Sequence, residues 1–195
     1  MAKGFRKTRR GVSAKLDEGE RALLAHLFVE VWELLGSESE DGSGVGDVGG
    51  SGQVDPLEAM VGIGTATDEP DDPALARLLP SAHRDDDDVA AEFRRYTEQG
   101  LRARKRAGLE TARQTLGREG GSLDLDRDEA RAWLVALTDV RLVLGERLEL
   151  RSDEDAEEIA ASLGELETDD PRAFLVAIYD FLTWLQESLV HALAA

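Results

Sequence analysis

The sequence predicts an all-α protein, a helical bundle of four main helices plus short helices, with a small β-hairpin near the N-terminus. Three observations predict this class. Apolar residues recur at helical spacing in several stretches, acidic caps precede most of them, and strand signals are few. The chain has 195 residues, of which 42% are hydrophobic, so we expect one helical domain over residues 1–195.

The N-terminal part predicts a hairpin followed by a helix. Residues 4–16 form two short extended runs about Arg10 and Gly11. Asp17 and Glu20 then have the spacing of a capping box, and Gly36 is expected to end the helix that follows. The anchors of the hairpin are Phe5, Val12 and Leu16, and the apolar face of the helix is Leu24, Leu27, Phe28, Val31 and Leu35.

The next segment is expected to be a flexible loop. Residues 37–54 are mostly glycine, serine and acids without an apolar period. Two Asp-Pro pairs, at Asp55 and Asp72, place a capping residue before a proline at the first helical position. They predict short helices at about 56–61 and 73–79.

Three long helices are predicted in the remainder. One runs from about residue 86 to 116, and one begins after a capping box of Asp126 and Glu129. The last begins at Asp170-Pro171, and its wide apolar face predicts that it is the central helix of the core. Residues 153–169 are expected to be an acidic insertion.

Charge is segregated along the chain. The net charge is −18, which by itself opposes binding to nucleic acid. Residues 1–15, however, carry six cations and no acid, and residues 91–118 are also basic. Such segregation can mark partner surfaces.

The long helix at 86–116 predicts an arginine stripe. At 100° per residue its members lie within about 20° of one line, opposite the apolar face. The stripe and the basic N-terminus are our candidate surface for an anion, nucleic acid or an acidic partner. The alternatives are a solvated face that pairs with the chain's own acids and a mobile basic tail. The candidates are Lys3, Arg6, Lys7, Arg9, Arg10, Arg95, Arg102, Arg106 and Arg113.

Arg141 lies inside the apolar arc of its helix, where an unpaired cation is costly. Asp139 is on a different face of the same helix. Asp180 on the last helix is therefore the predicted partner, in a structural ion pair.

No residue pattern predicts catalysis. The chain has no cysteine, and no pair of its three histidines has the spacing of a metal site. We therefore expect no metal, no cofactor and no enzymatic activity. No apolar run approaches the length of a membrane span and no secretory signal is evident, so a cytoplasmic location is expected.

Six stretches of the chain form recognisable motifs, namely Asp71–Pro80, His83–Asp85, Ala91–Glu98, Trp133-Leu134, Thr138–Gly145 and Tyr179–Leu189. They resemble an actinobacterial family, the domain of unknown function 2017. The resemblance implies a regulatory role, because at least one member is described as an oxidative-stress transcriptional regulator that acts with an alternative sigma factor and is switched by a cysteine pair. This chain has no cysteine, so that switch cannot operate here. Genes of the family typically lie beside that of the adaptor of the Clp protease.

Our functional hypothesis is a non-enzymatic regulatory protein that contacts DNA or a sigma factor through the basic segments. The alternatives are an adaptor-like partner of the Clp proteolysis machinery and an enzyme without a recognisable motif. The oligomeric state is left open.

Overall fold

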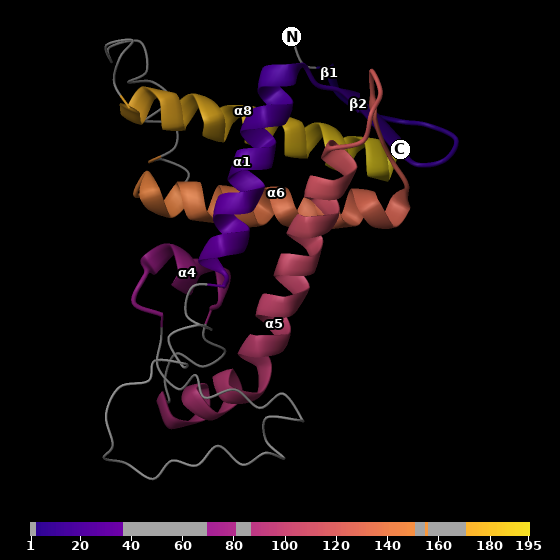
Figure 1. The fold of residues 1–195 in the computed structure, drawn as a ribbon. Helices are drawn as coiled ribbons and strands as arrows, with labels where there is room; N and C mark the ends of the chain where they lie inside the picture. Colours follow the sequence, from indigo (N-terminus) through magenta and orange to yellow (C-terminus); the bar gives the residue numbers. More distant parts are fainter. Residues whose placement is uncertain (1–2, 37–69, 81–86, 151–154, 156–170) are drawn as a thin grey trace.

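The computed structural model describes residues 3–36, 70–80, 87–150, 155 and 171–195 (Figure 1). The predicted loop at 37–54 and the short helix at 56–61 lie outside the described residues. So does the acidic insertion at 153–169, apart from Asp155.

The N-terminal hairpin is confirmed and belongs to a larger sheet. Strands β1 (Lys3–Lys7) and β2 (Val12–Lys15) pair in antiparallel fashion. A third strand, β3 (Leu123–Leu125), pairs antiparallel with β2, so that the order is β1-β2-β3. The expectation of an all-α protein was therefore too simple: the described fold is mostly helical with one small sheet. A strand of three residues was too short to give a sequence signal.

The four main helices are present, and each begins where the sequence indicates. They are α1 (Glu18–Leu34), α5 (Asp87–Leu116), α6 (Arg127–Arg147) and α8 (Pro171–Ala194). Both capping boxes are formed, by Asp17 in α1 and Asp126 in α6. The short helix α4 (Pro73–Leu78) follows its cap Asp72, whose carboxylate accepts a hydrogen bond from the Ala74 N–H.

The helices are arranged as two antiparallel pairs that cross (Figure 1). In the first pair, α6 lies along α8, with Thr138 near Gln186 and Gly145 near Tyr179. In the second pair, α1 lies along α5. This differs from a plain four-helix bundle. The central helix is α6 rather than the predicted last helix, because α6 contacts α1, α4, α5, α8 and β3.

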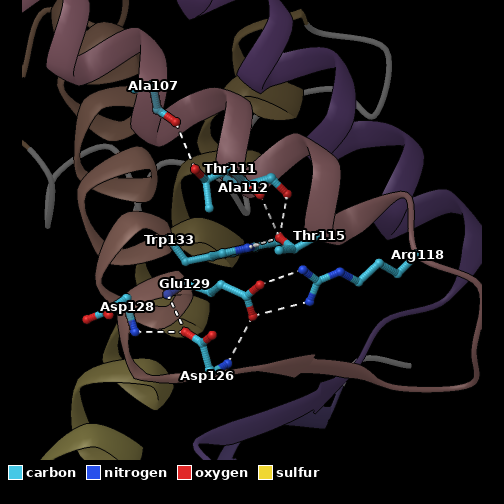
Figure 2. A network of polar contacts seen from close by, with 9 residues as sticks. All are labelled: Ala107, Thr111, Ala112, Thr115, Arg118, Asp126, Asp128, Glu129 and Trp133. Atoms are coloured by element: carbon cyan, nitrogen blue, oxygen red, sulfur yellow. Dashed lines mark hydrogen bonds and ion pairs between the residues drawn. The ribbon is translucent and has the colours of Figure 1, made fainter.

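The core is centred on Trp133 of α6, which is fully buried. Its ring meets Phe5 of β1 and Phe28 of α1 edge to face, at centroid distances of 5.9 and 5.3 Å. Its indole N–H donates to the Thr115 hydroxyl at 2.7 Å (Figure 2). That hydroxyl in turn donates to the α5 carbonyl oxygens of Thr111 and Ala112, each at 2.9 Å. One side chain thus joins the sheet and three helices.

One helix of the described part is long and apolar enough to cross a membrane by length and composition alone. It spans Arg172–Ala194, with a mean hydropathy of 1.3 and 28% of its most apolar stretch buried. In the structure this helix packs against α6 and β1. Among the described residues, these contacts leave Phe174 and Trp184 of the helix exposed.

Candidate anion-binding surface

The hairpin is held rigidly by its turn. Gly11 adopts a φ of 153°, and a Cβ at this position would lie 2.0 Å from the Leu125 carbonyl oxygen. Only glycine therefore lets the turn approach β3 so closely. The Thr8 N–H closes the turn by donating to the Gly11 carbonyl at 2.8 Å.

We expect Gly11→Ala to lower the free energy of unfolding by about 1–3 kcal/mol, because it adds backbone strain and a clash with Leu125. The measurement is chemical denaturation followed by circular dichroism. Gly121→Ala is the matched control, since a Cβ there meets nothing within 4 Å. Equal stability of the two variants would contradict the assigned turn geometry.

The inner and outer faces of the sheet differ sharply. The apolar anchors Phe5, Val12, Ala14 and Leu16 are buried, whereas every cation of the hairpin is exposed. Lys3 and Lys15 are directly opposite each other across β1 and β2, and Arg6 is opposite Ser13. Like charges directly opposite in a sheet destabilise it. The exposed cations, named here the hairpin cations, are Lys3, Arg6, Lys7, Arg9, Arg10 and Lys15.

Among the residues that the structure describes, no acidic side chain pairs with the hairpin cations. Within the described ranges, none of the six forms an ion pair. Two acids do lie near the turn, because Asp124 and Asp126 line an open hollow of about 540 Å³ together with Arg9 and Arg10.

These two acids are already engaged. Hydrogen bonds from the Ser13 and Ser122 hydroxyls hold the pKa of Asp124 below its ordinary value of 3.8. The Asp126 carboxylate accepts from the backbone N–H groups of Asp128 and Glu129, where the α6 dipole favours a negative charge (Figure 2). Hydrogen bonds within the fold thus hold both carboxylates, and neither forms an ion pair with Arg9 or Arg10 among the described residues.

The predicted arginine stripe is not an outward surface. Arg102 is buried, with its Nε 2.8 Å from Glu98 Oε1 and its Nη1 donating to the Leu35 carbonyl at 3.1 Å. That carbonyl is at the C-terminal end of α1, where the helix dipole favours a cation. Arg102 therefore ties α5 to α1.

The other members of the stripe also have local roles. The Arg106 guanidinium lies 3.8 Å from the centroid of the Trp32 ring, a cation–π contact between α5 and α1. Arg113 is exposed and binds both carboxylate oxygens of Glu110, which raises the pKa of Arg113 above its ordinary value. Arg95 lies in α5, and its side chain is outside the described part.

The hairpin and the stripe are not one patch. The hairpin precedes the N-terminal end of α1, whereas Arg102 and Arg106 hold the C-terminal end. The 17 residues of α1 separate these ends by about 25 Å. The sequence does contain a signal against an outward-facing stripe. Leu109 and Leu116 are seven and fourteen residues after Arg102, so they lie on the same side of the helix, and both are buried.

The predicted ion pair between Arg141 and Asp180 is absent. Arg141 donates to the Gln186 amide oxygen at 2.8 Å and to the Tyr179 hydroxyl at 3.3 Å, while Asp180 is exposed. The two Nη groups of this guanidinium thus donate to a neutral amide and a phenol. Its Nε is buried without a hydrogen-bond partner among the described residues.

A buried ion pair between α5 and α6 was not predicted from the sequence. Lys105 binds Asp139, a residue that is 1% exposed and has its second carboxylate oxygen buried without a hydrogen bond in the described structure. Burial raises the pKa of Asp139 above 3.8, against the lowering effect of Lys105.

The described residues include no group of three or more histidines or acids that could hold a metal ion. A cavity of about 180 Å³ lies between α1 and α5, beside Trp32 and Arg113.

Fold and site together define a mostly helical protein that presents a rigid basic hairpin. The chain belongs to the family described as "Domain of unknown function (DUF2017)", which matches residues 2–193. The chain is 34% identical over 190 residues to the "Putative oxidative stress regulator AosR" of Mycobacterium leprae, covering 90% of this chain and 79% of that protein. It is 35% identical over 155 residues to the "Oxidative stress regulator AosR" of Mycobacterium tuberculosis, covering 71% and 66%. No solved structure matches.

Proposed function

We propose that this protein is a non-enzymatic, cytoplasmic stress-response regulator that contacts DNA through the hairpin cations. The regulatory part rests on the names of its relatives, which are called oxidative stress regulators. The DNA contact rests on one observation: six exposed cations on the hairpin lack ion pairs with the described residues, in a chain with 41 acids.

The electrostatic repulsion between cations on the hairpin supports the proposal. Lys3 and Lys15 repel each other across the hairpin, and an acid at either position would relieve the repulsion. A surface that serves only solubility has no need of such a pair. A polyanion such as the DNA backbone would turn the repulsion into attraction.

The position of Arg9 and Arg10 also suits contact with the phosphate backbone of DNA. Arg9 and Arg10 lie at the tip of the hairpin, beyond the buried anchors Phe5 and Val12. Because the turn is fixed by Gly11, the two guanidinium groups extend from a rigid base, so less entropy is lost on binding. Arg9 and Arg10 are therefore the residues we assign to phosphate contact.

The test is a salt titration with labelled duplex DNA followed by fluorescence anisotropy. Each phosphate contact contributes about 0.9 to the slope of log K against log salt concentration. The double variant Arg9→Gln/Arg10→Gln is expected to reduce the magnitude of the slope by about 2 and to weaken binding at low salt.

Arg104→Gln/Arg131→Gln is the control, because it removes two exposed arginines on α5 and α6 and so matches the charge change. An equal effect of both double variants would mean that only net charge matters. DNA binding that is absent at every salt concentration would refute the DNA contact. A parallel titration with a sigma factor and with the Clp adaptor then assigns the hairpin to a protein partner.

A further inference from the structure

The cavity of about 180 Å³ between α1 and α5 has an apolar floor and a charged edge. Phe28 and Leu109 form the floor, and each is only 1% exposed. Trp32 forms a side wall and is 37% exposed, so its indole ring can be reached from solvent. Small-molecule sites commonly combine such an apolar surface with a few polar groups. The remaining lining residues are Val29, Glu33, Glu110 and Arg113.

The Trp32 wall is held in place from outside the cavity. The Arg106 guanidinium lies 3.8 Å from the centroid of the indole ring, yet Arg106 does not line the cavity. Arg106 is itself confined at the end of α1, where a Cβ at Gly36 would lie 3.3 Å from its Nη1. The ring is therefore oriented before a ligand arrives, so less entropy is lost on binding.

Two of the three charged lining residues neutralise each other. Arg113 donates to both carboxylate oxygens of Glu110, at 2.9 and 2.8 Å, and the Gln114 amide donates to the same carboxylate at 2.7 Å. These hydrogen bonds from Arg113 and Gln114 hold the pKa of Glu110 below its ordinary value of 4.5. The pair thus forms one edge of the cavity without adding net charge to it.

Glu33 is the third charged lining residue and is exposed. It forms no ion pair with the residues that the structure describes. The cavity therefore presents one uncompensated negative charge beside an apolar floor and an aromatic wall. A cationic group complements this charge, and the net charge of −18 of the whole chain also attracts cations.

We propose that this cavity, named here the α1–α5 site, binds a small organic amine that consists of one ring and a short aminoalkyl chain. The ring packs on Phe28 and Leu109 and against the part of the Trp32 ring that Arg106 does not contact. The ammonium group binds the Glu33 carboxylate. The size of the ligand follows from the volume of the site, because a cavity of about 150 Å³ holds one benzene molecule.

The same geometry disfavours an acidic ligand. A ligand carboxylate in the α1–α5 site would meet Glu33 and Glu110, which carry the same charge. Arg113 is the only cation of the lining, and its Nε and Nη2 already donate to Glu110. An acid would therefore have to displace a bidentate ion pair before it could bind.

The α1–α5 site is separate from the hairpin cations. Phe28 and Trp32 lie in the C-terminal half of α1, whereas the hairpin precedes the N-terminal end of this helix. The amine proposal therefore does not rest on contact with DNA, and failure of DNA binding leaves it unchanged.

Three probes of similar size and different charge test the site: phenethylamine, phenethyl alcohol and phenylacetate. Binding is followed by NMR at constant ionic strength, through the indole N–H signal of Trp32. We expect phenethylamine to bind with a Kd of about 1 mM, which is usual for a ligand this small. The alcohol is expected to bind about threefold to fivefold more weakly, because it lacks the ion pair, and phenylacetate more weakly still.

Two variants test the assigned contacts. Glu33→Gln is expected to weaken phenethylamine about threefold to fivefold and to leave the alcohol unchanged. Glu30→Gln is the matched control, because Glu30 is exposed on the same helix and does not line the cavity. Val29→Phe places a ring in the cavity and is expected to abolish binding of both probes. Circular dichroism verifies that each variant folds.

Absence of phenethylamine binding at every concentration would overturn the site. Equal affinities of the amine and the alcohol, or equal effects of Glu33→Gln and Glu30→Gln, would overturn the amine as its ligand. Tighter binding of phenylacetate than of phenethylamine would also contradict the proposal, because Arg113 would then select an acid.

Discussion

Replacing Trp133 with alanine is expected to lower the free energy of unfolding by about 3–5 kcal/mol, the usual cost of truncating a fully buried tryptophan. The ring of Trp133 is in contact with Phe5 and Phe28, so the cavity would open between the sheet, α1 and α6. Because a domain of this size is stabilised by only about 5–15 kcal/mol, much of the variant would unfold on mild heating. Thermal and urea denaturation measure the loss.

The hydrogen bond of Trp133 can be tested separately from its packing. Thr115→Val removes the acceptor of the indole N–H and is expected to cost about 1–3 kcal/mol, because the donor stays buried without a partner. In the background of Trp133→Phe, which has no such donor, the same change is expected to cost less. Equal costs in the two backgrounds would show that the bond does not contribute to stability.

Replacing Lys105 with methionine is expected to lower the free energy of unfolding by about 3–5 kcal/mol at neutral pH, because it leaves Asp139 as a buried, uncompensated charge. The double variant Lys105→Met/Asp139→Asn is expected to recover most of this loss. Arg104→Met is the matched control, since Arg104 is exposed on the same helix.

The cost of Lys105→Met is also expected to depend on pH. Burial raises the pKa of Asp139 above 3.8, so the folded protein holds this proton more tightly than the unfolded chain. The stability from this protonation is complete below pH 3.8 and is lost as the pH rises through the raised folded pKa. Loss of Lys105 raises that pKa further. The difference in stability between Lys105→Met and the wild type should therefore shrink on acidification, and a difference independent of pH would contradict the assignment.

The sequence predicted the elements whose signals are local. The capping boxes at Asp17 and Asp126 and the Asp-Pro start of α4 specify helix starts within a few residues, and all three are formed. Strand β3 could not be predicted, because its pairing partner β2 is more than a hundred residues earlier in the sequence. The loop-closure entropy lost on joining such distant segments is offset only by tertiary contacts.

The polar contacts were predicted less well, for a related reason. Charge spacing along α5 indicated a surface, but the side that faces α1 is decided by Leu109 and Leu116, which share the line of Arg102. The partners of Arg141 and Asp139 are set by how α6 lies against α8 and α5. The crossing of the helix pairs is a property of packed surfaces and leaves no periodic trace in the sequence.

The hydrogen bond from the Phe5 N–H to the Ser188 hydroxyl, at 2.9 Å, affects whether further strands can pair with the edge of the sheet. Exposed strand edges template the addition of further strands and so promote aggregation. Here the register of β1 shifts between Lys3 and Arg6, and its outer edge turns toward α8, where Ser188 takes up the Phe5 amide. The opposite edge, β3, has only three residues. The sheet is thus blocked against fibrillar growth on one side and too short to support it on the other.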